Sequence, residues 1–254
     1  MIKCTQNTYG GNAMKILIIR HGDPDYSIDS LTEKGRREAQ LLKDRLTKLD
    51  IRDFYCSPLG RAKDTAAPTL NALGRTAEIC DWLREFDGRI TDPKTGEKRG
   101  AWDRLPASLY GENDYYDRSK WLDTALYTSG DVKEKYGDVC RGLDELLARY
   151  GYIHDKNIFR VEKECADTIA LFCHFGVECV LLSHLLYSTP VTFWQGFVAL
   201  PSSVTTLATE EREQGIAHFR CSGFGDLSHL YAGNEPAAFA ARFCEVYSNF
   251  DERH

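Results

Sequence analysis

The chain has 254 residues, 43% of them hydrophobic, and a formal net charge of −6 at pH 7. The hydrophobic share is enough to build a sizeable core and excludes a largely disordered chain. The acidic balance argues against a dedicated nucleic-acid binder, which needs a basic face, although a local group of arginines can still bind an anion. No stretch is long and apolar enough to span a membrane, so we expect no membrane association.

The nine cysteines are scattered, form no Cys-x-x-Cys pair and are odd in number. This pattern predicts reduced thiols in a cytoplasmic protein, and neither a disulfide framework nor a zinc site. Residues 1–13 are polar and contain glycine, and they lack the apolar core of a secretory signal. We therefore expect an N-terminal extension over residues 1–13, followed by a single domain over residues 14–254.

The first predicted strand covers residues 15–20, an apolar run rich in branched side chains. It is bounded by Gly22 and Pro24, as buried strands of parallel sheets often are. Open α/β folds place their ligands at the carboxyl edge of such a sheet. The strand would therefore deliver Arg20 and His21 into a crevice, where Gly22 lets the chain turn and a ligand come close.

The remaining elements follow from helical spacing of apolar residues and from short branched or aromatic runs that end at turn residues. In chain order we predict a helix over 31–49, a strand over 51–57, a helix from 59, a strand over 77–86, an irregular insertion over about 87–131, a helix over 132–150, strands over 158–161 and 168–173, a helix over 177–187, strands over 203–208 and 216–221, and a helix over 235–247. This alternation predicts an α/β three-layer sandwich with a mostly parallel central sheet flanked by helices and with an inserted lid subdomain.

Four polar motifs fall at strand ends or helix starts of this plan. They are Arg20-His21-Gly22, Ser57-Pro58-Leu59-Gly60-Arg61, Leu83-Arg84-Glu85 and His174-Phe175-Gly176. Their order resembles the histidine phosphatase superfamily, also called phosphoglycerate mutase-like. The resemblance runs from residue 15 to about 187 and includes the Leu31-Thr32-x-x-Gly35 helix opening.

The chemistry of these residue types agrees with the resemblance. Arg20 and Arg61 could hold phosphoryl oxygens through charge-assisted hydrogen bonds. His21 could be the nucleophile that forms a covalent phosphohistidine, provided that its attacking nitrogen is unprotonated and its other nitrogen is held by an acceptor such as a backbone carbonyl. His174 would stabilise charge on the transferring group without a metal.

Glu85 is the predicted proton donor, which would protonate the leaving oxygen and then activate water. Asp81, Asp87 and the weaker candidate Asp23 are its competitors. Gly22 and Phe175 complete the predicted substrate-binding residues. Phe175 stands where relatives commonly have glycine, so it adds a bulky group beside the site.

The segment after His21 is short and lacks the Asn- and Trp-containing stretch of the mutases in the family. The expected function is therefore hydrolysis of a small phosphorylated substrate by a metal-independent phosphomonoesterase without an organic cofactor. A mutase-type phosphotransferase and a non-catalytic phospholigand-binding protein on the same fold are the alternatives. The insertion over 87–131 is interpreted as a substrate-facing lid, with a decorated surface or an oligomer contact as the alternatives.

Other candidate residues are expected to be structural. His154 is expected at an exposed position, His184 in the core or at an interface, and His229 in a supporting role. Cys173 and His174 point to opposite faces of a strand and cannot readily pair, so Cys173 is expected to be core packing. No metal cluster is evident. Residues 191–200, with Phe193, Trp194 and Phe197, could line the contact face of a homodimer.

Overall fold

The computed structural model describes residues 13–93, 96–238 and 246–249. Its central sheet has eight strands in the order β5-β4-β10-β1-β11-β12-β9-β8. The strands are β1 (Lys15–Arg20), β4 (Asp53–Cys56), β5 (Glu78–Ile79), β8 (Tyr152–Asp155), β9 (Ile158–Val161), β10 (Thr168–Cys173), β11 (Val204–Glu213) and β12 (Ile216–Asp226). The four strands from β5 to β1 are parallel, and the other half of the sheet is antiparallel.

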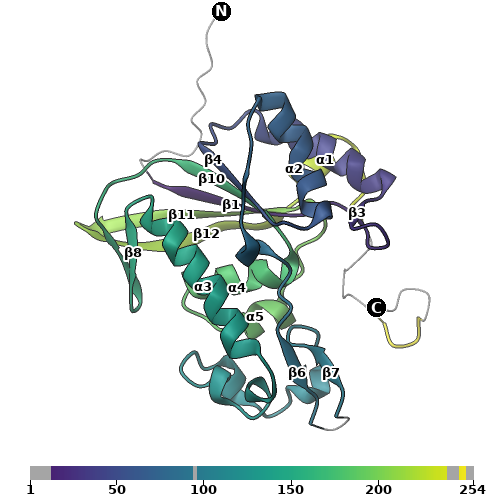
Figure 1. The fold of residues 1–254 in the computed structure, drawn as a ribbon, viewed down its shortest axis with the longest axis vertical. Coiled ribbons are helices and arrows are strands. Elements are labelled where there is room, and N and C mark those ends of the chain that lie inside the picture. Colours follow the sequence, from purple (N-terminus) through teal and green to yellow (C-terminus); the bar gives the residue numbers. More distant parts are fainter. Residues whose placement is uncertain (1–12, 94–95, 239–245, 250–254) are drawn as a thin grey trace, which may run out of the picture.

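Helices cover both faces of this sheet, so the predicted three-layer α/β fold is confirmed with a mixed sheet (Figure 1). One layer holds α1 (Glu33–Leu46) and α2 (Gly60–Leu73). The other holds α3 (Val132–Ala148), α4 (Phe175–Leu185) and α5 (Pro190–Gly196), and the short α6 (Ser228–Ala232) packs near α1. A small hairpin of β2 (Pro24–Asp25) and β3 (Ser30–Leu31) lies between β1 and α1.

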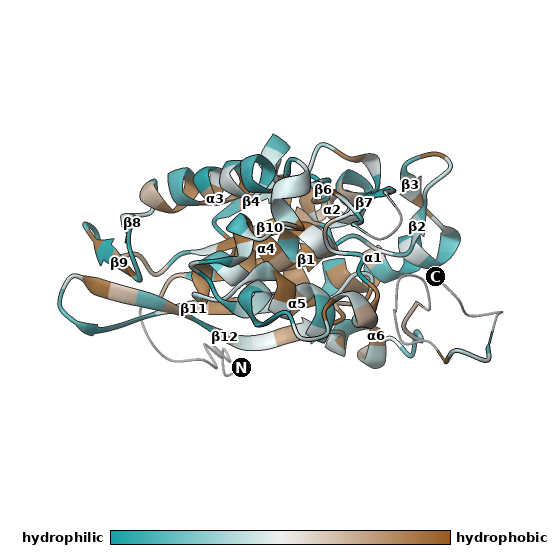
Figure 2. Cartoon of the chain, turned by 90° about the horizontal axis from the view of Figure 1, so that it is seen from below, coloured by the Kyte–Doolittle hydropathy of each residue, from teal (hydrophilic) through white to brown (hydrophobic). Residues whose placement is uncertain are grey.

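Alternating side chains of β1 explain the two layers. Ile16 and Ile18 belong to the core under α3, α4 and α5, while Leu17 and Ile19 belong to the core under α1 and α2. Successive strand residues point to opposite faces, so a strand that is buried on both sides needs an unbroken apolar run. Every residue of α4 is buried, and Figure 2 shows apolar residues concentrated in β1, β10 and α4.

The insertion over 87–131 consists of irregular chain, 3₁₀ turns and one small hairpin. Its elements are β6 (Arg89–Thr91), β7 (Lys98–Gly100), η2 (Pro106–Ser108), η3 (Asn113–Tyr116), η4 (Trp121–Asp123) and η5 (Tyr127–Ser129). Its buried aromatic residues Tyr115, Trp121 and Tyr127 join the same core as α3 and α5. The insertion therefore packs on the main core and builds no second one.

Several sequence predictions need correction. The strand predicted over 77–86 is wrong beyond two residues, because only Glu78–Ile79 pairs with β4 and the 3₁₀ turn η1 (Asp81–Leu83) follows. Strand β8, the hairpin β6–β7 and helices α5 and α6 were not predicted. The helix predicted over 235–247 falls largely on residues 239–245, outside the described residues, and residues 235–238 are not helical.

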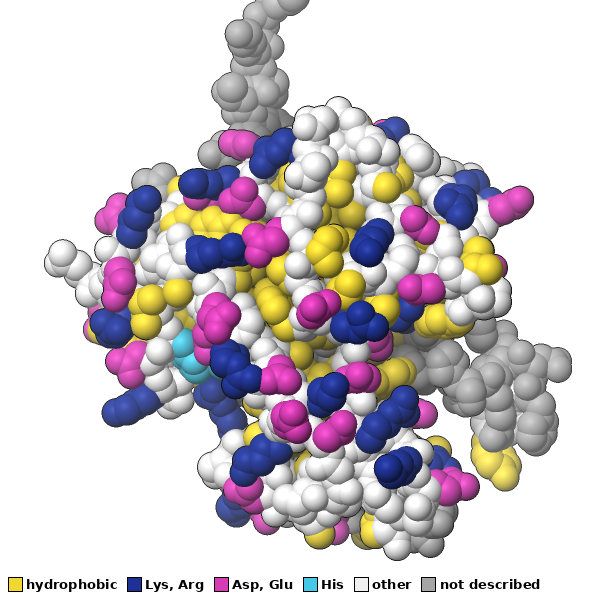
Figure 3. Space-filling view, viewed as in Figure 1, with side chains coloured by type: hydrophobic (Ala, Val, Ile, Leu, Met, Phe, Trp, Pro, Cys, Tyr) yellow, Lys and Arg dark blue, Asp and Glu magenta, His cyan; other side chains and the backbone are white. Residues whose placement is uncertain are grey.

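The proposed dimer face over 191–200 is also corrected in part. Phe193 and Trp194 are buried inside the chain, and Phe197 alone of the three aromatic residues is exposed. All cysteines among the described residues are free thiols, as predicted. None of the described helices has the length and apolar content of a membrane span. On the face that Figure 3 shows, basic and acidic side chains are interspersed.

Candidate active site

The register of three parallel strands brings the predicted motifs together. Arg20 pairs with Cys173 in the ladder of β1 and β10, and Phe172 pairs with Cys56 in the ladder of β10 and β4. The next residue of each strand is His21, His174 or Ser57. His21 and His174 therefore leave the sheet at one level, and Ser57 lies one register position before them. Parallel strands end at the same edge of a sheet, which is where α/β folds bind ligands.

His21 is almost completely buried and fixed at both ends of its backbone. Its N–H donates to the carbonyl of Cys173 (3.0 Å), and its carbonyl accepts from the N–H of Ser202 (2.9 Å). The ring atom Nδ1 lies 2.8 Å from the carbonyl oxygen of Gly22, which makes Nδ1 the protonated nitrogen and leaves the lone pair on Nε2. Burial and the charges of Arg20 and Arg61 lower the pKa of His21 well below its usual range, so the ring is neutral at pH 7.

His174 lies beside His21, with the two ring centroids 5.1 Å apart. Its Nε2 is 2.8 Å from the hydroxyl of Ser57, which also accepts the N–H of Leu59. Burial, with the charges around His21, lowers the pKa of His174 well below its usual range. A neutral ring that accepts the Ser57 hydroxyl hydrogen at Nε2 carries its own hydrogen on Nδ1, and Nδ1 is buried without a hydrogen-bond partner among the described residues.

Each of the two predicted arginines is held at one end of its guanidinium. Arg20 is buried and donates from Nη1 to the carbonyl of Ala199. Arg61 donates from Nη1 to Asp29 Oδ1 (2.7 Å). The Nε atoms of both arginines are buried and have no hydrogen-bond partner among the described residues. Both charges act on His21, His174 and Glu85, so the structure brings all five predicted polar residues into one electrostatic cluster.

Glu85 follows η1 and reaches the first turn of α4. Its Oε1 accepts from the N–H of Phe86 (2.8 Å) and of Val177 (3.2 Å). Burial raises the pKa of Glu85, although both N–H groups and the two arginines oppose this effect. Gly176 makes this position accessible, because a Cβ atom there would lie 2.6 Å from Glu85 Oε1.

The competing carboxylates lie in other surroundings. Asp81 and Asp87 are exposed, and Asp87 forms an ion pair with Lys135 (3.4 Å). Asp23 accepts from the hydroxyl of Thr32 (2.6 Å) at the start of α1. The geometry therefore favours Glu85 over the three aspartates as the carboxyl group that faces the cluster.

The sequence predicted Gly22 and Phe175 as substrate-binding residues, and the structure shows which protein groups they contact. A Cβ atom at Gly22 would lie 2.9 Å from the carbonyl oxygen of Gly35, so the close approach that needs glycine is to α1. The N–H of Gly22 donates to Thr65 Oγ1 (2.9 Å). Phe175 is buried, with the Arg20 guanidinium 5.6 Å from its ring centroid.

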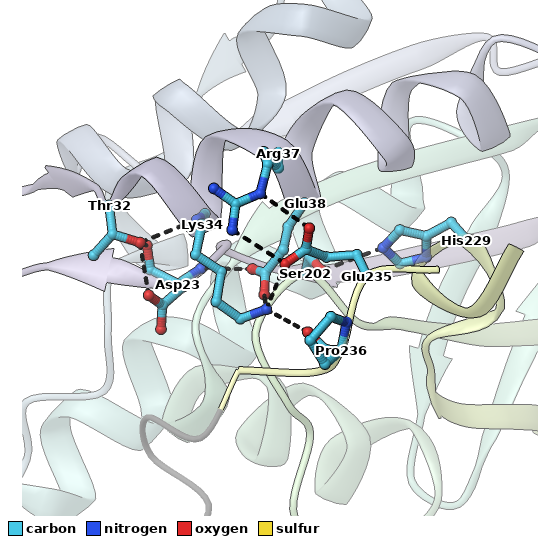
Figure 4. Close-up of polar contacts among 10 residues, drawn as sticks. Asp23, Thr32, Lys34, Arg37, Glu38, Ser202, His229, Glu235 and Pro236 are labelled. Carbon is cyan, nitrogen blue, oxygen red and sulfur yellow. Dashed lines mark hydrogen bonds and ion pairs between the residues drawn. The ribbon is translucent and has the colours of Figure 1, made fainter. Parts of the chain in front are cut away.

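The loop after His21 is tied to the face of α1 that packs against it, and Figure 4 shows the polar contacts. Glu38 is fully buried and accepts the N–H of Asp23 (2.8 Å), and Lys34 lies between Glu38 (3.5 Å) and Glu235 (2.9 Å). His229 lies 3.2 Å from the hydroxyl of Ser202, the residue whose N–H fixes His21. These contacts support the backbone on both sides of His21.

Sequence reasoning missed several of these supporting residues. Ser57 stands in a quoted motif at a strand end, and that position was the available signal. Asp29 and Thr65 act through hydrogen bonds over 32 and 43 sequence positions and carried no signal. Glu178, which is buried one turn after His174, was also missed. Burial raises the pKa of Glu178 to about 7, while Thr205 and Arg20 oppose the shift.

Comparison with known families identifies the superfamily of the chain. Residues 16–222 match the profile of the histidine phosphatase superfamily (branch 1), so the chain belongs to that superfamily. A probable phosphatase of Schizosaccharomyces pombe is 30% identical over 234 residues, which cover 85% of this chain and 95% of the relative. A 2,3-bisphosphoglycerate-dependent phosphoglycerate mutase of Thermoplasma acidophilum is 42% identical over 98 residues, which cover 34% of this chain and 46% of the relative.

Solved structures show the same fold. A mycobacterial glucosyl-3-phosphoglycerate phosphatase superposes with a TM-score of 0.55 at 20% identity, covering 84% of this chain and 99% of that one. A phosphoserine phosphatase of Entamoeba histolytica, solved with phosphoserine, gives a TM-score of 0.52 at 20% identity over 85% of this chain and 99% of that one. The family match and the fission-yeast relative confirm the sequence resemblance to the superfamily, and the solved structures agree with its fold.

Proposed function

We propose that the protein is a phosphomonoesterase that hydrolyses a small phosphorylated substrate through a covalent phosphohistidine on His21. The observation that carries this proposal is the state of His21: a neutral ring, with Nδ1 at the Gly22 carbonyl and the Nε2 lone pair left for attack. Nucleophilic catalysis needs such an unprotonated, fixed nitrogen.

In the first step, Nε2 of His21 attacks phosphorus while the bond from phosphorus to the leaving oxygen breaks. Arg20, Arg61 and His174 stabilise the phosphoryl oxygens, a role that their buried and unpartnered donor atoms support. Leaving a buried donor unpaired costs about 1–3 kcal/mol, so a cluster of them fits an anionic ligand. Catalysis of phosphoryl transfer depends mainly on positioning of the reacting groups and on electrostatic stabilisation of the charge on the phosphoryl group.

Glu85 donates its proton to the leaving oxygen in the same step, for which its raised pKa is suited. In the second step, the Glu85 carboxylate takes a proton from water, water oxygen attacks phosphorus, and the bond from phosphorus to His21 Nε2 breaks. Inorganic phosphate leaves and both side chains return to their first state. No metal or organic cofactor takes part in this scheme.

Phe175 and the insertion over 87–131 would shape substrate binding. The guanidinium of Arg20 lies over the ring of Phe175, and Gly22 keeps the strand end close to α1. Trp102 brings the insertion to the site, because its indole N–H donates to the carbonyl of Phe86 (3.1 Å) and its ring meets Phe175 edge-on. We propose the insertion as the lid that selects among small phosphorylated metabolites.

The first test is hydrolysis of an aryl phosphate, with chelator present, by wild type, His21→Ala and His218→Ala. His218 is a partly exposed histidine of β12 and serves as the matched control. We expect full activity with chelator in wild type and in His218→Ala, and loss of activity in His21→Ala. Acid-labile phosphate that is trapped on the wild-type protein but not on His21→Ala would identify the phosphohistidine.

Three results would contradict this function. Activity that survives in His21→Ala excludes His21 as the nucleophile. Loss of activity with chelator excludes the metal-independent scheme. Conversion of 3-phosphoglycerate to 2-phosphoglycerate faster than phosphate release would identify the mutase alternative, to which the partial match with a phosphoglycerate mutase gives weight.

The second test separates Glu85 from its neighbours. Glu85→Gln should lose roughly 10²- to 10⁴-fold in the rate on alkyl phosphates, whose leaving groups need a proton, and less on aryl phosphates. In wild type the same rate should decline as rising pH ionises Glu85, and this decline should be absent in the variant. Asp87→Asn is the comparison; if it abolishes the activity and Glu85→Gln does not, Asp87 is the proton donor.

A further inference from the structure

A second cluster of titratable side chains lies away from the active site. Asp144 on α3, His154 on β8 and His184 near the end of α4 each offer one ligand atom, and these atoms all lie within 4.8 Å of one another. Asp144 Oδ1 is 2.7 Å from His184 Nε2, and Asp144 Oδ2 is 3.2 Å from His154 Nδ1. Helix α3 packs against both α4 and β8 (Figure 1).

The hydrogen-bond partners of His154 do not fit a neutral imidazole alone. Its Nε2 lies 3.0 Å from the carbonyl oxygen of Lys156, and its Nδ1 faces the Asp144 carboxylate. Both partners are acceptors, yet a neutral ring has only one N–H to donate. If Nε2–H is given to Lys156, the lone pair on Nδ1 faces a carboxylate, which requires a positive charge between the two.

We propose that Asp144, His154 and His184 form a binding site for a divalent transition-metal ion of the zinc class. Two imidazole nitrogens and one carboxylate oxygen are a donor set that Zn²⁺ uses, with a fourth position for water. The Lys156 carbonyl supplies the outer hydrogen bond that commonly orients a metal-bound histidine. Tetrahedral ligands around zinc lie roughly 3.3–3.5 Å apart. Modest side-chain rotation would therefore widen the 2.7 Å contact between Asp144 and His184 and bring all ligand atoms, which now lie within 4.8 Å of one another, to that spacing.

The surroundings set limits on this site. The His184 side chain is 7% exposed, while those of His154 and Asp144 are 19% and 31% exposed, so an ion could enter from solvent on the His154 side. Arg118 is a neighbouring cation, whose guanidinium stacks on the ring of Tyr187 at 4.6 Å and whose charge acts on His154. That charge opposes a bound cation and weakens its affinity.

The position indicates a structural role. His184 comes ten residues after His174 on the same helix, which at 1.5 Å per residue places the site about 15 Å from the active site. A bound ion would join α3, α4 and the edge strand β8, and it would stabilise the folded chain by mass action. The sequence alone predicted no metal cluster, because Asp144 and His184 are separated by 40 positions.

The test is titration of the metal-stripped, full-length chain with Zn²⁺, followed by calorimetry and by thermal denaturation. Wild type should bind one Zn²⁺ per chain at least tenfold more tightly than His154→Gln or Asp144→Asn, and its melting temperature should rise with Zn²⁺. Visible absorption of the Co²⁺-loaded chain provides a third readout. Both variants keep every cysteine, so zinc held by thiols would remain in them.

His218→Gln is the matched control, because His218 also lies beside a carboxylate, Glu210 (2.9 Å), outside this cluster. It should bind Zn²⁺ like wild type. Equal binding by wild type and His154→Gln, or no binding by wild type, overturns the proposal; the second result would leave a protonated histidine between the two acceptors. Aryl phosphatase activity is measured in the same samples and should be unchanged in His154→Gln, so the site and the proposed function fail independently.

Discussion

Single residues decide how closely the backbone approaches the side chains of the site. Gly176 is the clearest case, because a Cβ atom there would lie 2.6 Å from Glu85 Oε1 and 3.2 Å from Trp102 Cδ1. Gly176→Ala should displace the Glu85 carboxylate and lower the rate on alkyl phosphates by roughly 10²-fold or more, the scale of general acid–base help. Steady-state kinetics on alkyl and aryl phosphates would measure the loss, which should be smaller for the aryl substrate.

Gly137→Ala is the control for this substitution. Gly137 lies inside α3, and a Cβ atom there meets nothing within 4 Å. Alanine should stabilise the helix by up to about 1 kcal/mol and leave the kinetics unchanged. A Gly176→Ala enzyme with the wild-type rate on alkyl phosphates would show that Glu85 tolerates the extra atom or does not act as the acid.

The same scale shows what the sequence can reveal about a site. His21 and His174 were predictable because each follows a buried apolar run, and strand ends of parallel sheets meet at one edge. Ser57 shares that position, at the end of the strand predicted over 51–57, but it was assigned no role in the site. Asp29 and Thr65 reach the site only through hydrogen bonds over 32 and 43 positions, which no local pattern records.

Helices also depend on hydrogen-bond partners that are distant in the sequence. The N-terminus of α2 has no side-chain cap of its own, since its first flanking residue is Leu59. Asp29, from the β2–β3 loop, replaces it by accepting the N–H of Gly60 (2.7 Å) while it also holds Arg61. Its φ of 48° is left-handed, a conformation that aspartate and asparagine tolerate better than alanine.

We therefore expect Asp29→Ala to lower the free energy of unfolding by about 1–2 kcal/mol, through the lost cap and the strained backbone. Asp29→Asn keeps an acceptor for Gly60 and the left-handed backbone, so it should lose much less. Urea denaturation of both variants and wild type would measure the difference. Equal losses in the two variants would mean that Asp29 stabilises the protein through its ion pair with Arg61 and not through the helix cap.

Helices were predictable where one face meets the core, and strands where both faces are buried. Strands β1 and β10 and helices α1 and α3 show that pattern plainly, and the structure has all four near their predicted bounds. The strand predicted over 77–86 was wrong, since β5 lies at the sheet edge with both residues exposed, and Leu83 and Phe86 reach the core from a turn and loop. Apolar content alone does not show whether a buried side chain belongs to a strand or to a turn or loop.

At the scale of the whole molecule, buried carboxyl groups make the free energy of unfolding depend on pH. Glu38 is fully buried beside the loop that follows His21 (Figure 4), and burial raises its pKa to about 7, although the backbone N–H of Asp23 and the charge of Lys34 oppose the shift. In the unfolded chain a glutamate ionises near its ordinary value of 4.5. Between pH 4.5 and pH 7 the Glu38 carboxyl is protonated in the folded chain and ionised in the unfolded chain. The stability that Glu38 contributes is therefore lost as the pH rises from 4.5 through 7.

Buried histidines act in the opposite direction, since burial lowers the pKa of His229 to about 4 and that of His21 and His174 as well. The wild-type pH profile therefore mixes both effects, and the difference between Glu38→Gln and wild type isolates one. Glutamine stays neutral, so this difference in unfolding free energy should shift in favour of the variant by about 3 kcal/mol between pH 4.5 and pH 8. Denaturant unfolding at several pH values measures it, with exposed Glu145→Gln as the control; a difference that does not change with pH would mean that Glu38 is already ionised in the folded protein at low pH.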